Sequence, residues 1–335
     1  MTAPDGMPVN AIRGVIDMIA MLVREHSPAE LVACMDADWR PAFRVAAIAT
    51  YKAHRVASGD AEETPATLAP QVPVIEQVLD AVGITRLGVA GYEADDVMGT
   101  LAVRASGQVD IVTGDRDLFQ LVDDAQPIRV LYTARGVKNL QLVDEAAVTA
   151  KYGIPGRAYA DFATLRGDPS DGLPGVPGVG DKTAAALITR FGSLEALIRA
   201  ADEGDELTSG QRAKLSAARD YLRVAPAVVQ VARHVPIPAA ELTLPAKPRD
   251  PQALAALSER YGLGSPWAAC PPRSKPRRDP RPGFVTPDAA SRPREPSTPP
   301  REPSTPPREP STPPRDPRRR LVNPRRRLVT LGAAP

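Results

Sequence analysis

The sequence has few of the residues that build disulfide-bonded or zinc-binding sites, and few aromatic residues. Its 335 residues contain 2 cysteines, 3 histidines and 4% aromatic residues. Cys34 and Cys270 are too few and too far apart for a disulfide framework or a zinc site. No apolar run approaches the ~20 residues of a membrane-spanning helix, and residues 1–30 lack a signal-peptide cleavage pattern. We therefore expect a cytoplasmic protein with no membrane partner.

Positive and negative residues are nearly equal in number but are unevenly distributed along the chain. The net charge of +2 averages an acid-rich middle and a basic end, so it says little about partners. Hydrophobic residues make up 43% of the chain, which is enough for a substantial core. The length exceeds that of one average domain, so we expect two domains or one domain with a tail.

Helical and extended patterns alternate over the first 140 residues. Apolar residues recur at helical spacing over 9–24, and a short apolar run at 31–35 is typical of a buried strand. Further strands are predicted at 87–89, 111–113 and 128–132, and further helices at 74–82 and 93–104. Such alternation predicts a parallel sheet, in which ligands bind beyond the carboxyl ends of the strands.

From about residue 143 onward the pattern is wholly helical. We expect helices over 144–152, 158–165, 182–191, 193–201, 209–224 and 251–261. Residues 266–335 hold 20 of the chain's 38 prolines and three copies of Arg-Glu-Pro-Ser-Thr-Pro-Pro, a composition typical of disorder. The predicted order is an α/β domain, an all-α module and a disordered tail.

Eight carboxylates lie where predicted strands or helices begin or end. Acids at such places are also ordinary caps and turns, and this alternative stays open for each motif taken alone. Like charges this dense repel each other in a low-dielectric cleft, so together they predict a bound cation. Because all the ligands are oxygens, Mg²⁺ or Mn²⁺ is the natural candidate. The predicted metal-site residues are Asp36, Glu93, Asp95, Asp96, Asp115, Asp117, Asp168 and Asp171.

A glycine hairpin follows the last acidic pair. Gly178 and Gly180 precede a predicted helix, where backbone N–H groups can approach a phosphate, and Lys182 adds a positive charge. A Gly-x-Gly alone is usually a tight turn, but this one lies between two helices. The predicted contacts to the DNA backbone are Gly178, Val179, Gly180, Lys182 and Thr183.

These motifs resemble the 5′-nuclease family, which comprises the flap endonucleases and the 5′-3′ exonuclease domain of bacterial DNA polymerase I. The likeness is greatest to stand-alone actinobacterial 5′-3′ exonucleases. It covers about residues 3–266 and rests on three motifs in this order: Glu-Ala-Asp-Asp at 93–96, Gly-Asp-x-Asp at 114–117 and Gly-Asp-x-Ser-Asp at 167–171. A helix-hairpin-helix follows them.

The resemblance implies a PIN-like domain over 1–140, a helical DNA-binding domain over 141–265 and a Pro/Arg-rich tail over 266–335. It implies a monomer that hydrolyses double-stranded DNA from 5′ to 3′, with 5′-flap endonuclease activity, in replication and repair. Two divalent ions would do this chemistry. The first would be held on the side of Asp36, Glu93, Asp95 and Asp96, and the second on the side of Asp115, Asp117, Asp168 and Asp171.

The segment from Tyr51 to Arg55 resembles the base of the family's helical arch. The resemblance implies that Lys52 and Arg55 contact the scissile phosphate and that Tyr51 stacks on an unpaired base. A solvated basic helix end is the alternative. Arg44 is expected to contact substrate or to form an ion pair.

Both ends of the chain depart from the family pattern. Family members open with a strand that ends in Asp-Gly, and its aspartate binds metal; this chain begins with what looks like the following loop. Either the true start lies upstream or the protein is truncated and impaired. After Pro266 the sequence suggests a frameshift, or else a real basic tail that adds nonspecific DNA affinity.

Two other functions remain open from the sequence. The absent aspartate is consistent with a DNA-binding protein that has little or no catalytic activity. A PIN-like ribonuclease is the third candidate, but the hairpin favours contacts to the phosphates of duplex DNA.

Overall fold

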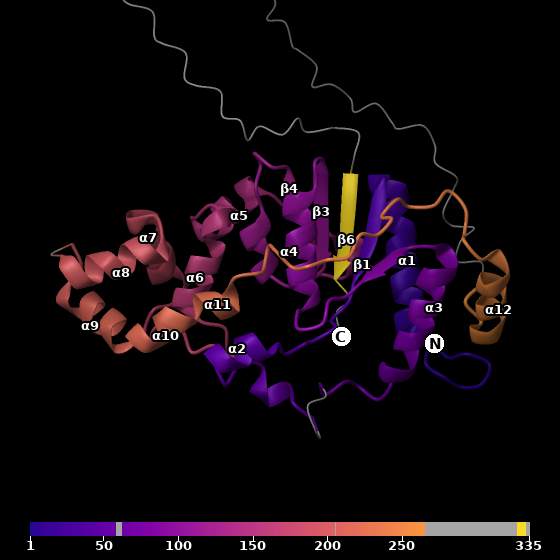
Figure 1. Ribbon diagram of the computed structural model, residues 1–335, viewed down its shortest axis with the longest axis horizontal. Coiled ribbons are helices and arrows are strands. Elements are labelled where there is room, and N and C mark those ends of the chain that lie inside the picture. Colours follow the sequence, from indigo (N-terminus) through magenta and orange to yellow (C-terminus); the bar gives the residue numbers. More distant parts are fainter. Residues whose placement is uncertain (58–61, 205, 265–326, 333–335) are drawn as a thin grey trace, which may run out of the picture. The chain divides into compact units, whose positions relative to one another are not determined.

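A six-stranded sheet lies at the centre of the fold (Figure 1). The computed structural model describes residues 1–57, 62–204, 206–264 and 327–332. The strands are β1 (Glu30–Cys34), β2 (Thr85–Leu87), β3 (Gln108–Thr113), β4 (Ile128–Tyr132), β5 (Gln141–Val143) and β6 (Arg327–Gly332). Their order is β2-β1-β6-β3-β4-β5, and only β5 pairs antiparallel to its neighbour. The predicted parallel sheet is thus confirmed for five strands, with an antiparallel strand at one edge.

Helices cover both faces of this sheet. Alternate residues of β1 belong to different buried clusters, because side chains along a strand point to opposite faces. Leu31 packs in the cluster of α1 and α3, whereas Val32 packs in the cluster of α4. The bounds of these helices are α1 (Asn10–His26), α3 (Val72–Val82) and α4 (Ala94–Arg104), and α12 (Pro251–Tyr261) packs against α3.

The helical module follows β5 and contacts the sheet through α5 (Figure 1). Its helices are α5 (Glu145–Tyr152), α6 (Tyr159–Arg166), α7 (Asp181–Phe191), α8 (Leu194–Glu203), α9 (Ser209–Ala217), α10 (Arg219–Val224) and α11 (Pro226–Val229). The predicted helix over 209–224 is two helices, which meet at Ala218. The short helix α2 (Ala42–Ala47) lies in the first domain and packs against α11.

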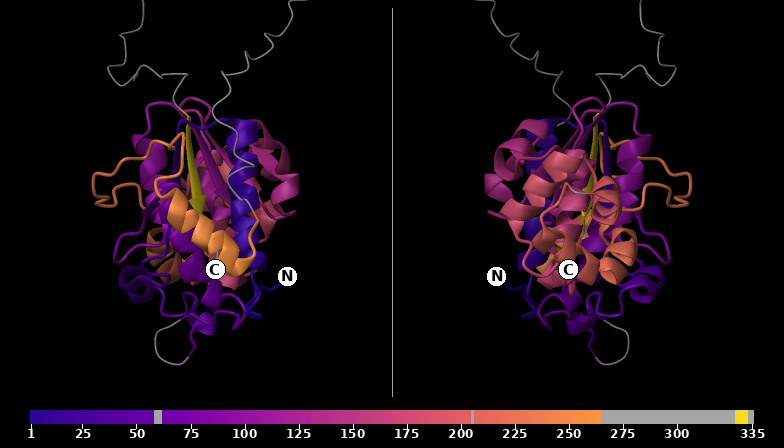
Figure 2. Two further views of the ribbon diagram at one scale, coloured as in Figure 1. Left: turned by 90° about the vertical axis from the view of Figure 1, so that its right-hand side faces the viewer. Right: turned by 90° about the vertical axis from the view of Figure 1, so that its left-hand side faces the viewer.

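The central strand comes from the far end of the sequence. β6 lies between β1 and β3 and is hydrogen-bonded to both (Figure 1), and Figure 2 shows the same strand, in yellow, in two further views. The expectation that residues 266–335 are disordered is therefore wrong for Arg327–Gly332; residues 266–326 and 333–335 lie outside the described residues. β6 occupies the centre of the sheet, but it comes from the C-terminal part of the chain and has no aspartate at its end.

None of the helices in the described ranges is both long and apolar enough to cross a membrane.

Candidate active site

An acidic cavity lies at the edge of the sheet where the parallel strands end. Because β1, β3 and β6 run in the same direction, their carboxyl ends meet at this edge. The cavity has a volume of about 350 Å³. Its lining includes the predicted site residues Asp36, Lys52, Arg55, Glu93, Asp95 and Asp115, together with Trp39, Glu62 and Gly332.

Glu93 is surrounded by positive and hydrogen-bonding groups. It caps the N-terminus of α4 and forms ion pairs with Arg44 and Lys52. The Tyr51 hydroxyl donates to both of its carboxylate oxygens, at 3.0 and 2.9 Å. Burial raises the pKa of Glu93, and the charges of Lys52 and Arg44 oppose that shift. These partners hold the Glu93 carboxylate in place at the cavity wall.

Asp96 is placed differently from its neighbours. Its side chain is fully buried, and its two oxygens accept hydrogen bonds from Arg44 Nη1 and Nη2, both at 2.7 Å. The backbone N–H groups of Glu93 and Ala232 also donate to it. Asp96 is not among the cavity-lining residues. It anchors α4 to the chain segment that follows α11.

Arg44 joins these elements and is itself only 3% exposed. Its Nε donates to the carbonyl oxygen of Val228 at 3.0 Å, in addition to its pairs with Glu93 and Asp96. Of the two roles expected for Arg44, the ion pair is confirmed. Its burial leaves no surface for a substrate contact.

Asp95 and Asp36 bring negative charges together in the cavity. Burial, followed by the charges of Asp115, Glu93 and Asp36, raises the pKa of Asp95 well above its ordinary value. Burial also raises the pKa of Asp36, although its Oδ1 accepts a 2.7 Å hydrogen bond from the Ala94 N–H group. Carboxylates that raise each other's pKa in this way favour a cation among them.

A second group of carboxylates adjoins the first through Asp115. Burial and the charges of Asp115, Asp171 and Asp168 raise the pKa of Asp117. Burial raises the pKa of Asp171, which the Lys52 charge opposes and the Asp115 charge reinforces. The charge of Asp115 therefore repels Asp95 of the first group and also Asp117 and Asp171 of the second group.

The turn at 168–172 packs against the loop that carries Lys52. Gly172 has φ +73°, and a Cβ there would lie 2.2 Å from the Thr50 carbonyl oxygen, so only glycine fits. The Lys52 N–H group donates to the Asp171 carbonyl oxygen at 3.0 Å, and Arg55 pairs with the Asp171 carboxylate at 2.9 Å. Lys52 itself has φ +46°, an uncommon conformation for a residue other than glycine. The two predicted cations are thus fixed beside the acidic groups.

Tyr51 does not fit the predicted role in base stacking. Its side chain is 4% exposed and packs in the main core cluster, while its hydroxyl donates to Glu93. A ring buried in this way has no free face for a base. The prediction that Tyr51 contacts DNA by stacking is therefore wrong, and its role here is to position Glu93.

The glycine hairpin lies between α6 and α7, as predicted. Gly178 has φ +73°, Gly180 is the N-cap of α7, and both glycines are exposed. Lys182 is exposed in the first turn of α7 and Thr183 is half-buried, whereas the Val179 side chain is buried. Only the backbone of Val179 therefore remains for a contact with DNA.

Lys214 is a residue of this region that the sequence analysis missed. Lys214 lies in α9, 36 residues after Gly178 in the chain. Its Nζ donates a hydrogen bond of 3.0 Å to the Gly178 carbonyl oxygen. No local pattern signals this contact, because the two residues meet only through the packing of the helical module. Lys214 adds a second positive charge to the hairpin.

The donor set suits a hard divalent cation in its chemistry and charge. All the acidic side chains of both groups offer oxygen, and their mutual repulsion raises the pKa of Asp95 and Asp117. In the described ranges, no three His, Cys, Asp or Glu side chains are arranged to hold one ion. The structure thus shows clustered carboxylates that suit a cation, with Lys52 and Arg55 already paired to two of them.

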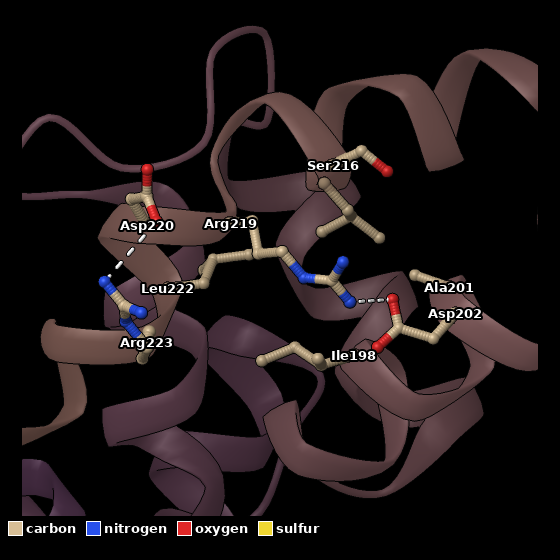
Figure 3. Close-up of a pocket in the computed structure, with 9 residues that line it drawn as sticks. Ile198, Ala201, Asp202, Ser216, Arg219, Asp220, Leu222 and Arg223 are labelled. Carbon is tan, nitrogen blue, oxygen red and sulfur yellow. Dashed lines mark hydrogen bonds and ion pairs between the residues drawn. The ribbon is translucent and has the colours of Figure 1, made fainter.

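A second cavity, of about 390 Å³, lies in the helical module between α8, α9 and α10 (Figure 3). Its apolar wall includes Ile198 and Leu222, and the Arg219 side chain reaches across it to Asp202. None of the predicted site residues lines it. Its charged groups pair with each other, Arg219 with Asp202 and Arg223 with Asp220.

The fold and the cavity together define a nuclease-like class of protein, in which acidic residues gather at the carboxyl edge of an α/β sheet and a helical module follows. The N-terminal resolvase-like domain of 5′-3′ exonucleases matches residues 1–153, and the C-terminal SAM fold of 5′-3′ exonucleases matches residues 154–252. The chain belongs to the 5′-3′ exonuclease family.

Similar proteins include 5′-3′ exonucleases and DNA polymerases I. The chain is 62% identical over 268 residues to a 5′-3′ exonuclease of Streptomyces coelicolor, covering 78% of this chain and 89% of the relative. It is 49% identical over 280 residues to a 5′-3′ exonuclease of Mycobacterium tuberculosis, covering 79% and 88%. It is also 36% identical over 270 residues to the thermostable DNA polymerase I of Thermus thermophilus, covering 79% of this chain and 30% of the polymerase.

Solved structures share the fold at low sequence identity. The 5′-exonuclease of bacteriophage T5 with bound divalent metal ions (zinc) has a TM-score of 0.52 and 18% identity, covering 65% of this chain and 80% of that one. A T5 flap endonuclease in a complex with DNA and metal ions has a TM-score of 0.50 and 15% identity, covering 66% and 80%. These likenesses confirm the predicted α/β fold.

Proposed function

We propose that this protein is a metal-dependent 5′-3′ exonuclease that hydrolyses phosphodiester bonds of double-stranded DNA and also cleaves 5′ flaps. One observation carries the proposal. The acidic cavity brings Asp36, Asp95 and Asp115 together with Lys52 and Arg55 at one edge of the sheet. Carboxylates that suit cations, set beside fixed positive side chains, are what a phosphate-cleaving site needs.

We assign the metal-binding role to two groups that share Asp115. Asp36, Glu93, Asp95 and Asp115 would close around one ion, and Asp115, Asp117, Asp168 and Asp171 around a second, because among the described residues no three such side chains are yet arranged to hold an ion. Bound Mg²⁺ or Mn²⁺ would lower the pKa of an attacking water and stabilise the charge of the phosphate. Asp96 is left out of this set, because it does not line the cavity and is fully buried against Arg44 and backbone N–H groups.

The chain's own cations would receive the substrate phosphate. Lys52 and Arg55 line the cavity and are held there by Glu93 and Asp171. Although burial opposes it, the charges of Glu93 and Asp171 raise the pKa of Lys52, so its ammonium stays protonated at neutral pH. A protonated Lys52 can stabilise negative charge that develops on the phosphate during hydrolysis.

The hairpin would bind the duplex by its backbone. The N–H groups around Gly178 and Gly180 precede α7, an α-helix whose N-terminus favours anions, and Lys182 and Lys214 add positive charge. Contacts of this kind position a duplex without reading its sequence. The relation to DNA polymerase I supports a role in replication and repair, and we propose a monomer in the cytoplasm.

A cleavage assay tests the proposal. The protein is incubated with 5′-labelled blunt duplex, 5′-flap DNA and a single RNA strand, in Mg²⁺, in Mn²⁺ or with EDTA. The proposal expects metal-dependent cleavage of both DNA substrates and a sharp loss in Asp115→Ala. Binding of DNA without cleavage in either metal would show a DNA-binding protein, and cleavage of RNA alone would show a ribonuclease.

A further inference from the structure

β6 joins two halves of the sheet that have no other strand between them. Residues Glu30 to Cys34 of β1 pair in register with Leu328 to Gly332, and residues Gln108 to Val112 of β3 pair with Arg327 to Leu331. Without β6, β1 and β3 would each expose a row of unpaired N–H and C=O groups. Such exposed edges are sites where an added strand binds.

The side chains of β6 also connect the two cores. Leu328 packs in the cluster of α4, and Val329 in the cluster of α1 and α3. Val329 and Thr330 are fully buried. Burial of Val and Leu side chains is favourable, so the groove holds this segment by apolar contacts as well as by backbone hydrogen bonds.

The sequence explains which segment fits the groove. Arg-Arg-Arg-Leu-Val occurs twice, at 318–322 and at 325–329. Asn323 and Pro324 follow the first copy, whereas Thr330 and Leu331 follow the second. Proline has no N–H group and cannot continue a strand that is hydrogen-bonded on both sides. Only the second copy can therefore fill a central position.

Docking of β6 also completes the acidic cavity. Gly332, the last residue of β6, lines the cavity together with Asp36, Asp95 and Asp115. In sequence, residues 262–326 separate the strand from α12, which is a long stretch of chain. The entropic cost of closing a loop rises only slowly with its length, so a connection this long opposes docking little more than a shorter one would. A long connection also allows the strand to leave the groove.

We propose that the groove between β1 and β3 is a binding site for an extended peptide, that residues 327–332 of the same chain fill it reversibly, and that the acidic cavity is complete only while it is filled. The first two statements are independent of the proposed nuclease activity. The third rests on it, because it concerns metal binding at the proposed active site. The C-terminal segment would thus control the assembly of the site.

Hydrogen exchange on the intact chain, followed by mass spectrometry, tests the docking directly. The amides of residues 328–332 should be protected to the same degree as those of β3 and β4. Exchange of these amides at the rate of an unfolded peptide would overturn the proposal. This measurement needs no substitution and no activity, so its result does not depend on whether the protein is a nuclease.

Cleavage of the connection tests whether the groove itself, without the covalent connection, holds the strand. A site for a sequence-specific protease is inserted between Pro300 and Arg301, and the cleaved protein is passed through a gel-filtration column. The C-terminal fragment should stay bound in the native protein and be lost in Val329→Asp, which places a charge in a fully buried position. Leu142→Asp is the matched control, since Leu142 lies in β5 of the same sheet and is 44% exposed. Loss of the native fragment, or its retention in Val329→Asp, would overturn the proposal.

Rescue in trans separates docking from general misfolding. A synthetic peptide of residues 322–335 is added to the cleaved Val329→Asp protein, and hydrogen exchange of β1 and β3 is measured. The peptide should restore their protection and should also restore the rise in melting temperature on adding Mn²⁺. If β1 and β3 are protected in full before any peptide is added, the groove does not need a strand and the proposal fails. Restored protection without a Mn²⁺ effect would overturn the third statement alone.

Discussion

Asp95 and Asp96 are neighbours in the first turn of α4, but their carboxylates have opposite surroundings. Asp96 is fully buried and has Arg44 and two backbone N–H groups as partners. Asp95 lines the acidic cavity, where burial and the charges of Asp115, Glu93 and Asp36 raise its pKa. Consecutive residues of a helix point about 100° apart, so one turn can serve two sides of the protein.

This difference separates a structural carboxylate from a functional one. The protein supplies all the positive charge that Asp96 needs, so its removal should affect folding. Asp95 lacks such a partner and is destabilising in the absence of a cation, so its removal should affect binding and catalysis. Four predictions, in order of decreasing effect, test this distinction and the proposed contact of the hairpin with DNA.

Asp96→Ala should cause the largest loss of stability. The substitution leaves the guanidinium of Arg44 buried without its main partner, which typically costs ~3–5 kcal/mol of unfolding free energy. Urea denaturation of the metal-free protein measures the loss. Asp95→Ala is the control and should show no such loss. Equal losses in the two variants would contradict the distinction.

Asp115→Ala should abolish most of the turnover and leave the fold intact. Asp115 adjoins both carboxylate groups, so both proposed ion sites would be damaged. Loss of even an indirect metal partner typically costs ~10–100-fold, and we expect at least about 100-fold here. Initial rates on a 5′-labelled duplex measure it. Glu195→Ala, an exposed carboxylate in α8, is the control. Normal turnover of Asp115→Ala would refute the metal assignment.

Lys182→Ala should weaken DNA binding without changing the chemistry. A plot of the logarithm of the binding constant against the logarithm of the salt concentration has a negative slope, and loss of one phosphate contact should make it less steep by about 0.9. The loss of affinity should be the same for different DNA sequences. Fluorescence anisotropy of a labelled duplex over a range of salt concentrations measures this slope. Lys247→Ala, an exposed lysine outside the hairpin, should leave it unchanged. An unchanged slope in Lys182→Ala would remove this residue from the DNA contact.

Asp95→Asn should raise the stability of the metal-free protein slightly at neutral pH. The raised pKa means that the folded state holds a proton which the unfolded state releases. The stability from this proton is fully present below pH 3.8 and is lost as the pH rises through the raised pKa. The gain in Asp95→Asn should therefore appear at neutral pH and shrink on acidification. Melting curves from pH 4 to 8 measure it, and a gain that grows toward low pH would reverse the assigned sign.

The local patterns predicted most of the helices and strands because each pattern lies within one element. β4 and α12 have the predicted bounds, and α1, α3 and α4 differ by one or two residues at their ends. The hairpin was also predictable, since its glycines and Lys182 are close in sequence. β5 was missed because three residues at the edge of a sheet leave little periodicity to detect.

The partners of the site residues were less accessible to prediction. Arg44 and Asp96 are 52 residues apart, and no periodicity links them. Tyr51 was expected to stack on a base because its segment resembles the base of the family's helical arch, yet its ring packs in the core. Gly332 was beyond prediction for a different reason, because composition marked its whole segment as disordered. A strand of six residues, three of them with apolar side chains, is too short to outweigh the prolines before it.

The sequence by itself determined where carboxylates, cations and glycines stand relative to the ends of helices and strands. Those positions depend on local spacing, and local spacing is what a sequence displays. The tertiary structure alone decided that Asp96 is neutralised by Arg44, that Asp95 faces other carboxylates and that β6 fills the centre of the sheet. These outcomes depend on contacts between distant segments, and such contacts form only when the two cores pack around the sheet.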